Sequence, residues 1–433
     1  MNRSRHYRLA KEGSWILAGQ VSSVLSALVL VRVLTEFLDP VQYGEVALGL
    51  TLTGLVNQVV MGGLGNGISR FYTIAAEKNA FGDYLAAAWH LMAVGTFAVV
   101  TIGLSLLIIL WLLDQPHLTA LAGAALLFSL ASTYNSTLSG VQNAARRRGI
   151  VAFHNGLDAW LKIVLAVALV IWVGRSSTVV VLAYAISAAI VATSQFLFLR
   201  RLIPSSSGAG NDRARWVSQI WTYARPFSCW GVFTWAQQSS DRWALQLFTT
   251  TDEVGLYAVL FQLGFTPIAI ATGMAVSFIG PIFYHRSGDA TSGARNANVH
   301  ELASRITVTC LGLTLVGFVA AVLLHEWIFD LLVGHRFRGI SHLLPWVLLA
   351  GGLFAATEVL ALKMMSDLKS AAMLWPKIVT ALFGIGLNVA GASIAGSAGV
   401  AYAAVCFSTL YFLWMLYLSK PRLTAASVQS APR

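Results

Sequence analysis

The sequence has few charged residues. Only 11% of its 433 residues are Asp, Glu, Lys or Arg, whereas soluble domains carry about 25%. Hydrophobic residues make up 57% of the chain, and its mean hydropathy is +0.70. This composition excludes an ordinary water-soluble domain and predicts a chain embedded in a lipid bilayer.

The sequence also has few cysteines and none of the common catalytic motifs. Cys229, Cys310 and Cys406 fall in apolar stretches without metal-ligand spacing, which argues against a disulfide framework or a zinc site. HExxH, GxSxG and Walker A sequences are absent, so the motifs of metalloproteases, serine hydrolases and ATPases are missing. We therefore expect a protein that is not an enzyme and uses no metal or cofactor. Its energy would come from a gradient or from the substrate's own concentration difference.

The chain contains instead a succession of long apolar stretches. A hydrocarbon core about 30 Å thick needs about 20 apolar residues per helix, and twelve stretches meet this requirement. They are too long for the strands of a transmembrane barrel and do not alternate, so we expect helices. The twelve predicted spans are 13–36, 44–65, 84–113, 117–141, 150–173, 178–199, 217–247, 255–284, 302–332, 343–363, 371–393 and 397–419.

Positive charges are distributed unequally between the two sides of these spans. With the N-terminus in the cytoplasm, 21 of the 29 Lys and Arg residues fall in cytoplasmic segments, and only Arg175, Arg336 and Arg338 fall on the opposite side. This asymmetry follows the positive-inside rule and predicts a multi-pass membrane protein with both termini in the cytoplasm. Orientation and attraction to anionic headgroups explain the net charge of +11, so we expect no nucleic-acid partner.

One short sequence pattern occurs twice. N-G-I-S-R-F-Y at 66–72 and G-P-I-F-Y at 280–284 each follow an apolar span that begins at a glycine after a short acidic turn, at Gly44 and at Gly255. We interpret each Phe-Tyr pair as the cytoplasmic end of the second span in its half of the chain. A joint rich in Pro, Ser and Gly separates the sixth span from the seventh, as expected for a linker.

The repeat predicts a domain organisation. We expect a six-helix N-terminal lobe at 1–200, a cytoplasmic linker at 201–216, a six-helix C-terminal lobe at 217–420 and a cytoplasmic tail at 421–433. Since six is an even number, both halves start on the same side and form parallel repeats. Two such bundles are typical of a transporter that rocks to open a shared cavity to each side in turn.

Charged residues within the spans are the candidate functional residues, because a charge in the bilayer is costly unless it faces protein or water. The cations inside the spans are Arg32, Lys162, Arg225, Arg242 and Lys377. Arg225 precedes Pro226, about eight residues into the seventh span. It is either a cavity cation that meets an anionic substrate or an arginine that extends to the cytoplasmic interface.

Arg32, Asp241 and Arg242 lie near the outer ends of the first and seventh spans. Asp241 and Arg242 are about 100° apart around a helix, which predicts that they do not face one another. The two arginines are candidate cavity cations, and Asp241 is a candidate gating or proton-coupling group that pairs with a cation across the bundles. The alternative for all three is anchoring at the membrane interface.

Two further cations have an acidic neighbour. Lys162 follows Asp158 in the favourable i, i+4 order, and Glu358 lies at a depth similar to that of Lys377 on the adjacent span. Neutralised pairs are one interpretation, and added binding charge on the lysines is the other. Glu358 is also a gating or proton-coupling candidate. His154 is expected at the membrane interface, with proton coupling as the alternative.

Three motifs together resemble a known family. They are R-V-L-T-E-F-L-D-P-V-Q-Y-G at 32–44, G-L-G-N-G-I-S-R-F-Y at 63–72, and S-S-D-R-W-A-L-Q-L-F-T-T-T-D-E-V-G-L-Y at 239–257. They resemble the polysaccharide-exporter branch of the multidrug/oligosaccharidyl-lipid/polysaccharide exporter superfamily. Position 29 is Val, where the family pattern has Gly.

The resemblance implies an all-α membrane fold of the MATE type, with about twelve helices in two pseudo-symmetric bundles around a central cavity. It implies a flippase of the inner membrane for lipid-linked oligosaccharides, similar to Wzx-type O-antigen and exopolysaccharide translocases. The cavity would be cationic and suited to a polyprenyl diphosphate sugar, with Arg32, Arg225 and Arg242 as candidates by position. Expected partners are this glycolipid, the phospholipid membrane and other glycan-assembly membrane proteins, and the chain is expected to be a monomer.

Three other functions remain as alternatives. A cation-coupled multidrug exporter of the sister branch would need acidic cavity residues, and this chain has more cations than free carboxylates in its spans. A membrane glycan polymerase, ligase or glycosyltransferase would need a larger outer loop than any joint here provides. A scaffold in a glycan-assembly complex is the third alternative.

Overall fold

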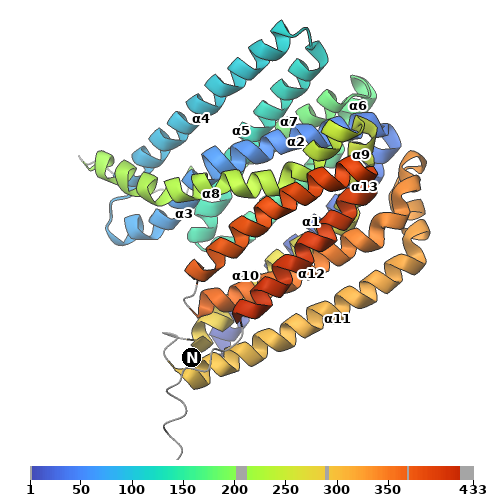
Figure 1. The fold of residues 1–433 in the computed structure, drawn as a ribbon. Helices are drawn as coiled ribbons and strands as arrows, with labels where there is room; N and C mark the ends of the chain where they lie inside the picture. The colour runs from blue at the N-terminus through green and yellow to red at the C-terminus, as the bar shows by residue number, and fades with distance from the viewer. Residues whose placement is uncertain (1, 201–211, 288–291, 368–369, 420–433) are drawn as a thin grey trace, which may run out of the picture. The chain divides into compact units, whose positions relative to one another are not determined.

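A computed structural model describes residues 2–200, 212–287, 292–367 and 370–419 (Figure 1). These residues are helical almost throughout and contain no strand, so the predicted all-α fold is confirmed for the described part of the chain. The elements are α1 (Asn2–Phe37), α2 (Pro40–Leu55), the π-helix η1 (Val56–Met61), α3 (Gly62–Glu77), α4 (Phe81–Leu112), α5 (Pro116–Ala144), α6 (Arg148–Trp172), α7 (Ser177–Arg200), α8 (Arg213–Phe248), α9 (Thr251–Gly264), α10 (Thr266–Ser287), α11 (Gly293–Leu332), the 3-10 helix η2 (His335–Leu343), α12 (Leu344–Ser366), the 3-10 helix η3 (Ser370–Met373) and α13 (Leu374–Ser419).

Nine helices within the described ranges are long and apolar enough to cross a membrane. All twelve predicted spans fall on helical residues, but α1 and α8 are not among the nine, and α13 covers the last two spans in one element. Inside α13 the backbone leaves helical geometry at Ala395 and Gly396, where two helices meet at a kink. The multi-pass membrane character is therefore shown, whereas the count of twelve stays a prediction.

The second helix is longer than the predicted span 44–65. It continues through α2, η1 and α3 from Pro40 to Glu77, so Phe71 and Tyr72 lie inside it and do not mark its end. The interpretation of this Phe-Tyr pair as a helix end is therefore wrong. No proline interrupts residues 66–77, and the helix stops only at Asn79, whose positive φ of 52° turns the chain.

The acidic turn before this helix is a helix cap. The backbone N–H of Gln42 donates to the Asp39 carboxylate at 2.8 Å, and the N–H of Asp39 donates to the Gln42 side-chain oxygen at 3.2 Å. Pro40 occupies the first turn, where no N–H is needed. This reciprocal capping box satisfies N–H groups that would otherwise be unpaired, which explains why α2 begins here.

The chain divides into two compact units. Unit 1 comprises Met1–Val259 and Trp327–Ile340, and unit 2 comprises Leu260–Glu326 and Ser341–Arg433. These units reflect packing, whereas the lobes at 1–200 and 217–420 were inferred from repeat symmetry, so the lobe boundaries stay a prediction. Residues 201–211 of the predicted linker and the whole tail at 421–433 lie outside the described residues.

Unit 1 has a core in which α8 packs against the first-half helices α2, η1, α3 and α4 (Figure 1). Met61, Leu64 and Tyr84 are buried there together with Trp216 and Ile220 of α8. The Tyr84 hydroxyl donates to the Ile68 carbonyl at 2.8 Å, which satisfies its polar end within the core.

The two repeated glycines meet one another within unit 1. A Cβ on Gly44 would lie 2.2 Å from the Thr251 carbonyl oxygen, and a Cβ on Gly255 would lie 1.9 Å from the Pro40 carbonyl oxygen. Each glycine therefore contacts the residue four positions before the other. This reciprocity is what two equivalent helices related by a twofold axis produce, and only glycine permits so close a crossing.

Unit 2 has its own core between α12 and α13. Leu360 and Met364 of α12 are buried with Tyr411 and Met415 of α13. A smaller cluster joins Phe283 of α10 to the start of α11 and to α12.

Candidate functional site

The helix α8 carries Arg225, Asp241 and Arg242, three of the seven predicted site residues. Its mean hydropathy does not reach that of the nine apolar helices, because polar residues recur along its whole length. Helix α8 is nevertheless held closely against α3. A Cβ on Gly63 would lie 2.8 Å from the Ala224 carbonyl oxygen, so glycine lets the two helices touch.

Arg225 is exposed on the outward face of α8. Its neighbour Ala224 is completely buried against α3, which directs the arginine away from the core. The helix continues through Pro226 without interruption. Within the described residues, the Arg225 guanidinium has no hydrogen bond or ion pair. Trp221, one helical turn before it, is 48% exposed. Such a guanidinium is available to a ligand.

Arg242 and Asp241 interact with one another. The Arg242 Nη1 lies 3.4 Å from Asp241 Oδ1, and the same oxygen accepts the backbone N–H of Arg242 at 2.7 Å. The buried Tyr257 hydroxyl donates to the same carboxylate. The expectation that Asp241 and Arg242 do not face one another is wrong, because the long arginine side chain folds back around the helix to the short carboxylate beside it.

Arg32 is bound near the end of α1. Its Nη1 donates to the Val333 carbonyl at 2.9 Å and lies 3.3 Å from the Glu36 carboxylate. The Thr35 hydroxyl accepts the N–H of Gly334 at 2.9 Å. Arg32 and Thr35 together attach the segment Trp327–Ile340 to α1, and this explains why that segment belongs to unit 1.

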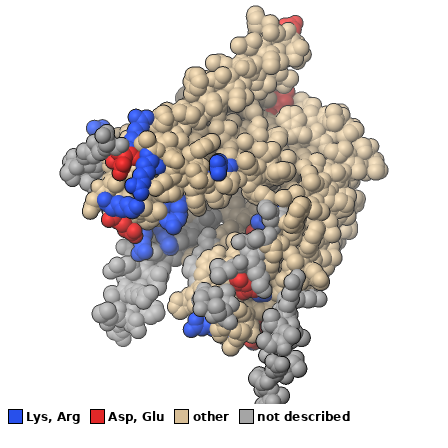
Figure 2. All heavy atoms as spheres, turned by 60° about the vertical axis from the view of Figure 1, so that its left-hand side comes forward, with Lys and Arg blue, Asp and Glu red and all other residues tan. Residues whose placement is uncertain are grey.

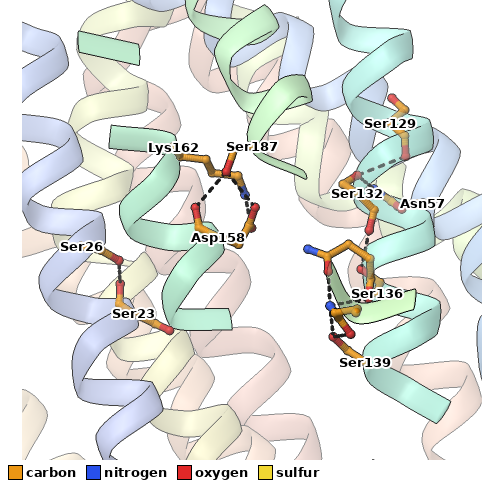
Figure 3. A network of polar contacts seen from close by, with 12 residues as sticks. Ser23, Ser26, Asn57, Ser129, Ser132, Ser136, Ser139, Asp158, Lys162 and Ser187 are labelled. Carbon is orange, nitrogen blue, oxygen red and sulfur yellow. Dashed lines mark hydrogen bonds and ion pairs between the residues drawn. The ribbon is translucent and has the colours of Figure 1, made fainter. Parts of the chain in front are cut away.

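Lys162 forms the predicted pair with Asp158 on α6 (Figure 3). Its Nζ lies 2.6 Å from Asp158 Oδ2, and the Ser187 hydroxyl of α7 donates to the other carboxylate oxygen at 3.3 Å. The ammonium also lies 5.2 Å from the centre of the Phe128 ring. The charge of Lys162 is therefore neutralised within its own helix, which leaves it little capacity for a ligand.

Glu358 and Lys377 lie in unit 2, and both side chains are partly buried. Among the described residues, no ion pair within 4 Å joins them, so their pairing stays a prediction. Their proposed gating, coupling and binding roles stay predictions too, as do those of the residues in unit 1.

Two residues have surroundings that the sequence did not indicate. His154 is completely buried, with Nδ1 2.8 Å from the Ile150 carbonyl and Nε2 3.0 Å from the Ser194 hydroxyl, so both ring nitrogens have protein partners, and its position at the membrane interface stays a prediction. Lys363, counted above among the cytoplasmic charges, is 4% exposed. It donates to the Ser419 carbonyl at 2.6 Å and lies 3.1 Å from Asp367.

Sequence reasoning missed two amides in the π-helix η1. The Asn57 side chain donates to the Ser132 hydroxyl of α5 at 3.1 Å (Figure 3) and accepts from Thr133. The Gln58 side chain donates to the Gln238 side-chain oxygen of α8 at 2.8 Å. Adjacent amides in an apolar span were a visible signal, but their partners lie 75 to 180 residues away.

The remaining basic residues of unit 1 are gathered at helix ends. Exposed cations lie at the ends of α3, α5 and α7 and at the starts of α6 and α8; they are Lys78, Arg146, Arg147, Arg148, Arg200, Arg213 and Arg215. Arg70 is also exposed and lies within α3. Figure 2 shows Lys and Arg side chains concentrated at one edge of the face in view, beside a broad uncharged surface. This concentration agrees with the charge asymmetry that predicts the orientation of the chain.

In the part of the chain that the structure describes, no group of three His, Cys, Asp or Glu residues is placed to hold a metal ion. The predicted cations also do not converge within unit 1. Arg225 and Arg242 are separated by about 25 Å along α8 at 1.5 Å per residue, and Arg32 and Lys162 have partners of their own. Arg225 is therefore the strongest candidate for contact with an anionic ligand.

Comparisons with known proteins agree with this architecture. The sequence matches a family described as "Polysaccharide biosynthesis protein" over residues 9–285, and it has no significant match among curated proteins.

Solved structures share the fold at low identity. The lipid II flippase MurJ in an inward closed conformation aligns with a TM-score of 0.68 at 10% identity, over 94% of this chain and 87% of that chain. The inward-facing form of a multidrug resistance MATE family transporter of the MOP superfamily gives 0.64 at 14%, over 95% and 96%. The Vibrio cholerae MATE transporter VcmN in its bent form gives 0.55 at 13%, over 94% and 99%.

Proposed function

The chain belongs to the polysaccharide biosynthesis protein family, and on that premise we propose that it moves a lipid-linked oligosaccharide across the cytoplasmic membrane by alternating access. Its place in the multidrug/oligosaccharidyl-lipid/polysaccharide exporter superfamily, expected from the three sequence motifs, is confirmed by the family match and by the shared fold. It is a multi-pass membrane transporter. The proposed substrate is a polyprenyl diphosphate that carries a glycan for a surface polysaccharide such as lipopolysaccharide or exopolysaccharide.

The observation that carries this proposal is the environment of Arg225. It is exposed in the first half of α8, and among the described residues no carboxylate pairs with it. An arginine in that position is stable only if it faces water or an anionic ligand. Its planar guanidinium donates two parallel hydrogen bonds to a phosphate, which makes it well suited to a diphosphate.

The chemistry of the substrate requires such a group. A diphosphate with attached sugars cannot enter hydrocarbon unaided, because its charges and hydroxyls would lose their hydration. A protein cation replaces part of that hydration with charge-assisted hydrogen bonds. The prenyl tail stays in the bilayer throughout, so the protein has to shield only the headgroup.

The same charge pattern argues against export of cationic drugs. In unit 1, Asp158 is paired with Lys162 and Asp241 with Arg242. An exposed cation at Arg225 would repel a cationic drug, whereas it attracts an anionic glycolipid.

The experiment that tests the proposal is headgroup flipping in proteoliposomes that contain the purified chain and a fluorescent polyprenyl diphosphate sugar. Wild-type protein should move the headgroup across the bilayer, and Arg225→Ala should slow it by at least about tenfold, the size expected for loss of a hydrogen bond to a charged group. Arg225→Lys should retain part of the rate, because the positive charge remains. The planar group that donates two parallel hydrogen bonds to a phosphate is lost.

Arg305→Ala is the matched control, because Arg305 lies on α11 in a highly exposed pair with Glu301. It should leave the rate unchanged. Absence of flipping by the wild-type protein, together with extrusion of a cationic dye, would overturn the proposed function.

A further inference from the structure

Gln58 and Gln238 form a polar pair between η1 and α8 in unit 1. Gln58 belongs to the π-helix η1 inside the 38-residue helix Pro40–Glu77, and Gln238 belongs to α8. Their amides share one hydrogen bond of 2.8 Å. A π-helix adds a residue to one turn and commonly marks a functional position. Here it directs Asn57 towards α5 and Gln58 towards α8.

The pair leaves hydrogen-bonding capacity unused. The Gln58 Oε1 is buried and has no donor within the described residues. The Gln238 nitrogen donates no hydrogen bond to any described residue, and this side chain is exposed. A buried acceptor without a donor costs about 1–3 kcal/mol. The contact between η1 and α8 therefore combines a buried acceptor without a donor and an exposed donor, the Gln238 amide, that is open to a ligand.

The position of the pair makes contact with lipid tails unfavourable. It lies far from both ends of the helix that contains Gln58, and amides in hydrocarbon pay the full cost of their missing hydrogen bonds. The exposed Gln238 amide is stable there only if its surroundings are polar. Those surroundings are water or a polar part of the substrate.

A tryptophan with a fixed ring lies beside the pair. Trp235 is one helical turn before Gln238, and its indole N–H donates to the Thr51 carbonyl at 2.8 Å. Gly54 of α2 faces the same ring, since a Cβ there would lie 3.6 Å from Trp235 Cδ1. The ring is held in one orientation before any ligand arrives, which lowers the entropic cost of stacking on it.

We propose that Gln58 and Gln238, with Trp235 beside them, form a binding site for the sugar of the transported glycolipid. A ring hydroxyl of a sugar accepts from the exposed Gln238 amide, and Gln58 holds that amide in place through its hydrogen bond to the Gln238 oxygen. The site is distinct from Arg225. Gln238 lies about 20 Å farther along α8 and about 140° around its axis, so the two contact different parts of the molecule. This inference rests on the proposed function.

The test compares two ligands on the purified full-length chain in detergent. One is a polyprenyl diphosphate that carries a single N-acetylhexosamine, and the other is the same polyprenyl diphosphate without sugar. Wild-type protein should bind the sugar-bearing lipid about tenfold more tightly, as a hydrogen bond of modest net strength together with stacking on Trp235 allows. Gln58→Leu and Gln238→Leu should abolish this preference and leave the affinity for the bare lipid unchanged.

Two further variants separate recognition from folding. Gln237→Leu changes the neighbouring glutamine, whose side chain takes no part in the pair, and should keep the full preference. Gln238→Asn keeps the amide but withdraws it by one methylene, so it should lose most of the preference with an unchanged melting temperature. Equal loss of affinity for both lipids in Gln238→Asn would show a structural role and overturn the inference.

The outcomes distinguish this inference from the proposed function. If wild-type protein binds both lipids equally, or if the leucine variants keep the preference, the sugar site is wrong while diphosphate recognition stands. If wild-type protein binds neither lipid, the proposed function fails and the sugar site fails with it.

Discussion

At the scale of single residues, Arg225 and Arg242 differ although they share one helix. Arg242 has a carboxylate at 3.4 Å and a side chain that is only 17% exposed. Arg225 is exposed and has no acidic partner among the described residues. Charge in a membrane helix therefore does not identify a binding residue by itself, because the local partner decides whether the charge is available to a ligand.

The ion pair of Asp241 provides a prediction about stability. Asp241→Ala should lower the free energy of unfolding by about 2–4 kcal/mol, because it removes the carboxylate partner of the largely buried Arg242 guanidinium. The matched control is Asp330→Ala, whose partner Arg338 forms an exposed pair worth about 0–1 kcal/mol. Thermal unfolding of both variants in detergent is the measurement. Equal effects would show that Asp241 contributes no more than a surface pair.

Cys229 provides a reporter for the surroundings of Arg225, because it is exposed one helical turn away. In a variant with Cys310→Ser and Cys406→Ser, Cys229 should react with a membrane-impermeant thiol reagent, since only a hydrated thiol ionises readily. Polyprenyl diphosphate should slow this labelling severalfold. A variant that retains only Cys406 is the control, and its labelling should not respond to the ligand. Unreactive Cys229 in intact vesicles would place this face of α8 against lipid.

At the scale of elements, the contact between α8 and η1 depends on the absence of a side chain at position 231. A Cβ on Gly231 would lie 2.1 Å from the Gln58 carbonyl oxygen, so a larger residue has to push α8 away from the π-helix. The same movement would separate Gln58 from Gln238. The glycine thus connects helix packing with the geometry of the amide pair.

Gly231→Val should therefore destabilise the chain by about 1–3 kcal/mol, the usual cost of overpacking, and should also remove the preference for the sugar-bearing lipid. Gly312→Ala on α11 is the control, because a Cβ there meets nothing within 4 Å. It should be neutral or stabilising by up to about 1 kcal/mol. Melting temperatures and binding of the two lipids measure both effects. If Gly231→Val keeps the preference for the sugar-bearing lipid, the geometry of the Gln58–Gln238 pair does not depend on the packing of α8 against η1.

At the scale of the whole molecule, two features agree on a doubled architecture. The sequence repeats a glycine after an acidic turn, and the structure brings Gly44 and Gly255 into reciprocal contact. The exposed cations of unit 1 gather at the ends of α3, α5 and α7 and at the starts of α6 and α8. The joint with Arg175 lies at the opposite ends of α6 and α7.

This charge pattern predicts the orientation of the chain. A fluorescent protein fused after residue 433 should fold and fluoresce in the cytoplasm. An alkaline phosphatase fused at Gly174 should be active, since that enzyme needs an oxidising compartment. The control fusion at Arg147, in the basic turn, should give no phosphatase activity. Phosphatase activity of the fusion at Arg147 and not of the fusion at Gly174 would show the opposite topology. Arg225 would then lie near the outer surface of the membrane.

The sequence by itself determined the membrane class, the approximate spans and the resemblance to the exporter superfamily. These depend on local composition and on short motifs, because partition into a bilayer is a property of each apolar stretch. The Lys162–Asp158 pair was predictable for the same reason, since an i, i+4 pair lies within one helix. The length of α3 was not predictable, because the end of an amphipathic helix carries no sharp signal of its own.

Only the tertiary structure decided which polar groups have partners. His154 and Lys363 each have one partner that lies 40 or 56 positions away, in addition to a local one, and Gln58 meets Gln238 across 180 positions. Such distances along the chain leave no pattern in one sequence, because the contact arises when separate helices pack. Whether a polar side chain in a span is a structural contact or a binding group depends on those packed neighbours, and for Arg225 and the Gln58–Gln238 pair the neighbours leave groups free for a ligand.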